Sequence, residues 1–124
     1  MAGKFVIKET NTGVNFSLKA GNGEVIGVSQ VYSSEKACRD GIESVKKYAP
    51  NAEIEDQTEE GYGKVKNPKY EVYENLAKEF RFRLNAKNGE NILTGEGYKS
   101  LAGCLKGIES IKTNAADAEI VKAE

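Results

Sequence analysis

Residues 16–26 read FSLKAGNGEVI, and residues 82–92 read FRLNAKNGENI. A second matching pair follows at the same offset of 66 residues, GIESVK at 41–46 and GIESIK at 107–112. Between Phe16–Ile54 and Phe82–Ile120 about half of the positions are identical. Self-similarity at a fixed offset marks a structural unit that occurs more than once. The chain is therefore one unit written twice.

The second strand of each unit has the clearest periodicity. Residues alternate between apolar and polar along Phe80–Ala86, and Val14–Ala20 repeats the pattern. Such alternation is typical of a strand with one face on a core and the other toward water. Asn22-Gly23 and Asn88-Gly89 follow, and both residue types tolerate positive φ, so each pair predicts a tight hairpin.

A strand before the alternating segment and a strand after it complete a three-stranded meander. We expect one side of each strand to face the core. The inward residues expected on the first strands are Phe5, Ile7, Tyr70 and Val72, and those on the third strands are Ile26, Val28, Ile92 and Thr94.

A helix is predicted over residues 34–48 and again over 100–114. Cys38, Gly41, Ile42, Val45 and Ala49 fall on one stripe at 100° per residue, and Cys104, Gly107, Ile108, Ile111 and Ala115 reproduce it. Ser33 or Ser34, and Ser100, are the expected N-caps. Glycine costs about 1 kcal/mol relative to alanine in mid-helix, so we expect Gly41 and Gly107 to allow a close approach.

A short strand closes each unit, at residues 52–55 and 118–121. The order of elements is β-β-β-α-β, twice, which is an α+β fold. Repeat 1 then spans 4–56, a charged and glycine-interrupted linker spans 57–68, and repeat 2 spans 69–122. Because a unit of this length is close to the lower limit for a self-sufficient core, we expect residues 1–124 to form a single compact domain.

The repeated motifs resemble those of the YegP-like family of small bacterial tandem-repeat proteins. They are F-x-L-x-A-x-N-G-E at Phe16–Glu24, Tyr32 before the helix and G-I-E-S-V-K at 41–46, all present again from Phe82 onward. The resemblance implies one antiparallel-rich sheet with pseudo-two-fold symmetry, exchanged C-terminal strands and both helices on one face. In the family this unit is present as tandem repeats or as two subunits, and for this chain we expect a monomer with an internal pseudo-dimer. The resemblance implies no activity and no functional residues.

The chain offers no catalytic or metal-binding signature. It has no histidine, which excludes Ser-His-Asp and Cys-His catalysis and histidine-containing zinc sites within one chain. Cys38 and Cys104 occupy the same position in each repeat and are expected to be buried hydrophobes. We therefore predict no catalytic residues, no cofactor and no metal, and a protein that is not an enzyme.

The charge balance gives no long-range attraction to nucleic acid or to acidic lipids, because 18 Lys and Arg face 19 Asp and Glu for a net charge of −1. No apolar run resembles a signal peptide or is long enough to cross a bilayer. We expect a soluble cytoplasmic protein with no membrane partner.

The sheet face that the helices leave uncovered is the candidate binding surface. Tyr73, Arg81 and Arg83 from repeat 2 and Lys19 from repeat 1 are expected there by strand alternation. The leading hypothesis is a non-enzymatic interaction module with a protein partner. One alternative is single-stranded nucleic-acid binding on this face. Another is a small-ligand or enzymatic pocket where the repeats meet, with Glu43 and Glu109 as a carboxylate pair.

Overall fold

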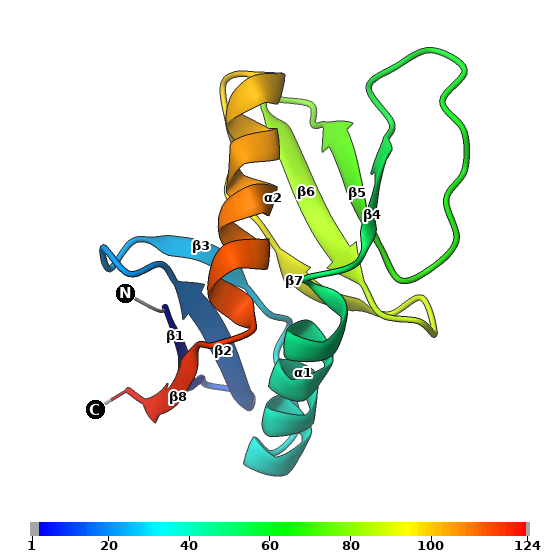
Figure 1. The fold of residues 1–124 in the computed structure, drawn as a ribbon. Helices are drawn as coiled ribbons and strands as arrows, with labels where there is room; N and C mark the ends of the chain where they lie inside the picture. Colours follow the sequence, from blue (N-terminus) through cyan, green and yellow to red (C-terminus); the bar gives the residue numbers. More distant parts are fainter. Residues whose placement is uncertain (1–2, 124) are drawn as a thin grey trace.

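The computed structural model describes residues 3–123, which form one eight-stranded sheet and two helices (Figure 1). The first repeat contributes β1 (Lys4–Glu9), β2 (Val14–Lys19), β3 (Val25–Val28), α1 (Glu35–Tyr48) and β4 (Glu53–Asp56). The second contributes β5 (Lys69–Glu74), β6 (Phe80–Asn85), β7 (Asn91–Thr94), α2 (Leu101–Ala115) and β8 (Glu119–Lys122). Residues 57–68 contain neither helix nor strand and loop away from the sheet (Figure 1).

The two repeats exchange their last strands. The strand order is β4-β5-β6-β7-β3-β2-β1-β8, so β4 of the first repeat pairs with β5 of the second, and β8 of the second pairs with β1 of the first. Both exchanged pairings are parallel, whereas all the other neighbours in the sheet are antiparallel. At the centre the repeats meet through β3 and β7, where Val28 pairs with Thr94. The predicted sheet with exchanged strands is confirmed.

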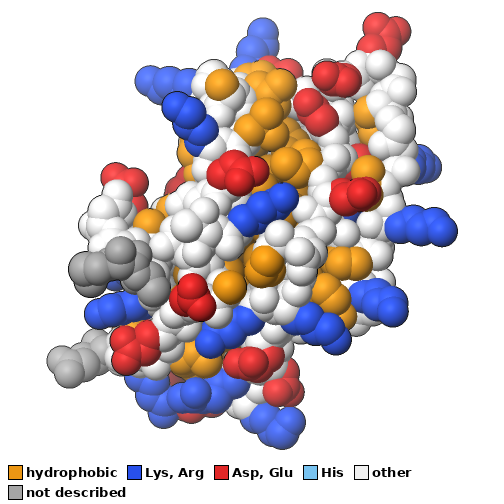
Figure 2. Space-filling model, viewed as in Figure 1, with side chains coloured by type: hydrophobic (Ala, Val, Ile, Leu, Met, Phe, Trp, Pro, Cys, Tyr) orange, Lys and Arg blue, Asp and Glu red, His pale blue; other side chains and the backbone are white. Residues whose placement is uncertain are grey.

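Both helices cover the same face of the sheet and each reaches into the other repeat. Helix α1 contacts β2 and β7, and α2 contacts β6 and β3. The two predicted apolar stripes are buried, with Ile42 and Ile108 fully inaccessible at their centres. In the view from the helix side, hydrophobic side chains gather alongside α2 while charged side chains surround the rim (Figure 2). The core is thus shared by the repeats.

Local sequence signals fix the turns and the helix starts. Gly23 and Gly89 have φ values of 87° and 88°, as the two predicted hairpin turns require. The hydroxyl of Ser34 accepts a hydrogen bond from the backbone amide of Ala37 at 3.1 Å, and Ser100 caps α2 in the same way. Of the two expected caps of α1, Ser34 is therefore the one used.

The third strand of each repeat departs from the prediction. Thr94 lies opposite Arg83 on the helix-free face, and Leu93, opposite Leu84, is fully buried. Val28 is likewise only half-buried, opposite Ser17. Each third strand carries one extra residue, Ile92 in β7 and Ile26 in β3, and this bulge shifts its register against the second strand. An extra residue changes which side chains face the core. The expectation that Val28 and Thr94 face inward was wrong.

Candidate binding surface on the helix-free face

The helix-free face changes character from one edge of the sheet to the other. Strand pairing aligns one row of side chains across all eight strands. From β4 to β8 this row is Glu55, Glu71, Arg83, Thr94, Val28, Ser17, Val6 and Val121. The row is ionic on β4, β5 and β6 and mainly apolar on β3, β1 and β8, so the two halves of one surface differ in chemistry.

Glu55 is the buried centre of the ionic half. Only 2% of this residue is exposed, because the linker of residues 57–68, called the connector from here on, folds back over it. Its carboxylate accepts hydrogen bonds from the side chain of Gln57 at 2.7 Å, the backbone amide of Val65 at 2.8 Å and the ammonium of Lys69 at 2.9 Å. These donors, in that order of effect, lower the pKa of Glu55 to about 2. The carboxylate is a structural anchor for the connector.

Arg83 and Tyr73 lie side by side on the helix-free face, and both are engaged with their neighbours. The guanidinium of Arg83 lies 4.8 Å from the centre of the Tyr73 ring, and its Nε donates to Glu71 at 2.6 Å. Lys69 pairs with the other oxygen of Glu71 at 3.2 Å. Burial alone would raise the pKa of Glu71, but the hydrogen bonds from Arg83 and Lys69 hold it below its usual range. Two carboxylates and two cations thus neutralise one another.

The other two predicted residues, Arg81 and Lys19, form no ion pair with Glu55 or Glu71. Arg81 donates from Nη2 to the carbonyl of Gly95 at 2.9 Å, which turns its head toward the backbone. Lys19 lies on β2, three strands away from β6. Three of the four predicted residues therefore belong to the second repeat's ionic half, and Lys19 belongs to a separate surface.

That separate surface, which we call the lysine face, covers the first repeat. Its members are Lys4, Val6, Lys8, Ser17, Lys19, Val28, Val121 and one exposed carboxylate, Glu119, which lies opposite Lys4. Lys4 and Lys8 are exposed, Lys19 is half-buried, and none of the three forms an ion pair with any residue from 3 to 123. Lys4 and Val6 were missed from the sequence, although their alternation with Phe5 and Ile7 was a usable signal.

The glutamates considered as a carboxylate pair and the two cysteines lie outside the helix-free face. Glu43 and Glu109 are exposed on their helices. Cys38 and Cys104 are free and buried, and burial raises the pKa of Cys104 to about 11. In the part of the chain that the structure describes, no three His, Cys, Asp or Glu residues are grouped as a metal site would require.

Two tandem β-β-β-α-β repeats with exchanged edge strands define a class of small α+β proteins, and comparison with known proteins gives the family. A model of a domain of unknown function, DUF1508, matches residues 10–56 and 76–121. The chain belongs to this family, the YegP-like or UPF0339 proteins. The family has no established biochemical function.

Relatives of two lengths match the chain. The "UPF0339 protein in ptx operon 5'region" of Stutzerimonas stutzeri is 37% identical over 98% of this chain and 97% of its own length. A UPF0339 protein of Treponema denticola is 56% identical over 54 residues, which are 44% of this chain and 93% of that protein. The second relative therefore spans a single repeat.

Solved structures agree with the fold. The solution structure of yegP from E. coli, described as a protein of unknown function, has a TM-score of 0.81 and 28% identity, and the match covers 98% of this chain and 93% of that one. A UPF0339 protein of Shewanella oneidensis has a TM-score of 0.80 at 28% identity, with 98% and 92% covered. Neither helix within residues 3–123 has the length and apolar character of a membrane span.

Proposed function

We propose that the protein is a non-catalytic binding module that holds a protein partner on its lysine face. The observation that carries the proposal is the contrast between the two halves of the helix-free face. The cations of the second repeat are neutralised by Glu55 and Glu71. In the first repeat, Lys4, Lys8 and Lys19 surround apolar side chains without an ion-pair partner among the described residues. This face has three lysines and a single carboxylate, Glu119, around half-buried valines, and an excess of one charge beside partly exposed apolar side chains favours a complementary partner.

The chemistry of the lysine face favours an acidic protein segment that carries apolar side chains. Val121, Val6 and Val28 lie on β8, β1 and β3, and strand spacings of about 4.8 Å make this apolar row about 14 Å wide. Carboxylates of the partner would pair with the lysines on either side of the row. Single-stranded nucleic acid fits less well because it needs aromatic platforms. The nearest such ring, Tyr73, is covered by Arg83.

The proposal places the protein in the cytoplasm. Cys38 and Cys104 are both free thiols in the structure, and free thiols persist in reducing compartments. A cysteine-labelling experiment on unfolded protein taken directly from cells tests this location, since two reactive thiols are expected and a blocked pair would contradict it.

The binding surface is tested by reversing its charge. Lys4, Lys8 and Lys19 are changed together to Glu, and Lys64, Lys66 and Lys87, which are also exposed, are changed to Glu in a charge-matched control. Proteins recovered from lysate with the wild type are purified and titrated against all three forms. We expect affinity for an acidic partner to fall at least about tenfold with the lysine-face variant and to be nearly unchanged with the control.

Two outcomes contradict the proposal. One is equal binding of the partner by wild type and lysine-face variant. The other is a saturable shift of lysine-face amides on titration with a single-stranded oligonucleotide but with no purified acidic partner, which would assign the face to nucleic acid instead.

A further inference from the structure

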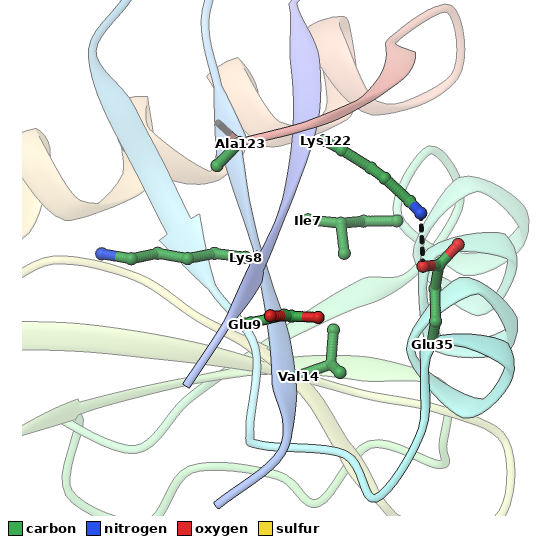
Figure 3. A pocket seen from close by; sticks show the side chains of 7 residues that line it. All are labelled: Ile7, Lys8, Glu9, Val14, Glu35, Lys122 and Ala123. Carbon is green, nitrogen blue, oxygen red and sulfur yellow. Dashed lines mark ion pairs between the residues drawn. The ribbon is translucent and has the colours of Figure 1, made fainter. Parts of the chain in front are cut away.

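A cavity of about 600 Å³ opens on the helix side of the sheet, at the edge of the first repeat. Its lining comes from the β1–β2 hairpin (Ile7, Lys8, Glu9 and Val14), from the start of α1 (Glu35) and from the end of the chain at the exchanged strand β8 (Lys122 and Ala123) (Figure 3). Its volume lies within the range of about 300–1,000 Å³ typical of small-molecule sites. Because β8 belongs to the second repeat, this cavity exists only where the repeats meet.

The duplicated sequence shows that the lining of the cavity differs between the repeats. At the offset of 66 residues, Val14 corresponds to Phe80 and Glu35 corresponds to Leu101. Phe80 and Leu101 are both partly buried against the core. The second repeat thus has large apolar side chains at the two positions where the first has a smaller one and a charged one. The same fold is filled in one copy and open in the other.

The charges around the cavity are unequal. Glu35 is held by Lys122 at 2.7 Å and by Arg39 at 3.0 Å. Glu9 also lines the cavity, and no ion pair to it occurs among residues 3–123. Lys8 lines the cavity too and has no ion pair among residues 3–123, but its ammonium extends away from Glu35 (Figure 3), so the unpaired carboxylate at the cavity is that of Glu9.

We propose that this cavity binds a small organic cation whose ammonium group pairs with Glu9 and whose aliphatic body packs on Ile7 and Val14. Ile7 is only 4% exposed and supplies an apolar floor. The carboxylate can pair with the ammonium group of an alkylammonium ion while the apolar floor packs against its alkyl chain. Lys8 borders both the cavity and the lysine face, but Glu9, Ile7 and Val14 do not belong to that face, so this proposal does not depend on the proposed protein partner.

The full chain is titrated with n-hexylammonium as the probe, and binding is measured from the chemical shifts of the backbone amides. We expect saturable shifts centred on residues 7–9 and 14, with weaker binding of n-hexanol and no binding of n-hexanoate. The change Glu9→Gln should weaken binding by about tenfold or more, the usual effect of losing a charged hydrogen-bond partner. The matched control is Glu74→Gln, since Glu74 is the exposed counterpart of Glu9 in the second repeat.

A second variant tests the cavity itself. Val14→Phe introduces the residue that the second repeat already accommodates at this place, and it should abolish hexylammonium binding while leaving the dispersed amide spectrum of a folded protein. The proposal is overturned if hexanol or hexanoate binds as tightly as hexylammonium. It is equally overturned if Glu9→Gln and Glu74→Gln bind alike, if a folded Val14→Phe binds like the wild type, or if hexylammonium causes no saturable shifts.

Discussion

Gly41 and Gly107 show how a single residue can be required in mid-helix. A Cβ built on Gly41 would overlap the hydroxyl of Tyr32 and lie 2.7 Å from its Cζ atom, and Gly107 stands in the same relation to Tyr98. The close approach expected from the sequence is therefore made by the tyrosine that precedes each helix. The benefit of packing this ring offsets the conformational cost of glycine.

We predict that Gly41→Ala lowers the free energy of unfolding by about 1–3 kcal/mol, the usual cost of overpacking a filled core. Helix propensity alone predicts a gain of about 1 kcal/mol from this change, so the sign separates the two explanations. Urea denaturation of the variant measures the difference.

Gly63→Ala is the control for this prediction. Gly63 has open space around its Cα and no positive φ, so its replacement should change stability by less than about 0.5 kcal/mol. A Gly41→Ala variant as stable as the wild type would show that Tyr32 moves aside without loss.

Among the elements, strands with strict alternation and helices with a complete apolar stripe were predictable, because their periodicity is local. The residues of β2, β6, α1 and α2 carry that information themselves. The facing of β3 and β7 was not predictable from alternation, because each contains one extra residue opposite its partner strand, which interrupts the alternation. Register depends on contacts between strands that a single segment does not encode.

The candidate surface was predictable only in part for a related reason. Strand alternation correctly brought Tyr73, Arg81 and Arg83 to one region, since side-chain direction is a local property. It gave no information on what these groups contact. The ion pair of Arg83 with Glu71 and the cover that the connector places over Glu55 both depend on tertiary placement. The cavity beside Glu9 likewise needs the exchanged strand to form.

The anchoring of the connector on β4 leads to a pH-dependent prediction. The pKa of Glu55 is lowered from 4.5 to about 2 in the folded protein. Its contribution to stability is therefore complete above about pH 4.5 and is lost as the pH falls toward 2. Glu55→Gln should be less stable than the wild type at pH 7, and its stability should fall less steeply between pH 4.5 and 2.

Glu53→Gln is the control on the same strand. Glu53 is exposed and makes no ion pair within the described part of the chain, so its removal should leave the acid limb of the stability curve unchanged. Parallel denaturation curves for the wild type and Glu55→Gln across this pH range would contradict the anchoring role.

In the whole molecule, the similarity of the two repeats determines the fold, and the differences between them determine the proposed binding sites. The fold depends on what the repeats share, since each lends the other its last strand and a helix that crosses the centre. The proposed binding sites depend on what the repeats do not share. The unpaired lysines of the helix-free face lie in the first repeat, and the cavity beside Glu9 lies where the first repeat meets the exchanged strand β8. At the corresponding positions the second repeat has neutralised charges or larger apolar side chains.

The central claim is that each repeat needs a strand from the other to complete its sheet. The edge of β1 shows this most directly. In the full chain this edge is covered by β8. An isolated first repeat has no β8, and its own β4 pairs with a strand that it also lacks. An unpaired strand edge is a template for association, so two copies would satisfy one another by exchanging β4.

The most direct measurement is the mass and folding of an isolated first repeat, residues 1–56, by sedimentation equilibrium combined with urea denaturation. We predict no folded monomer: the fragment is either unfolded or a dimer whose stability rises with protein concentration. A monomer that unfolds cooperatively, with a midpoint independent of concentration, would contradict the claim that each repeat needs the other.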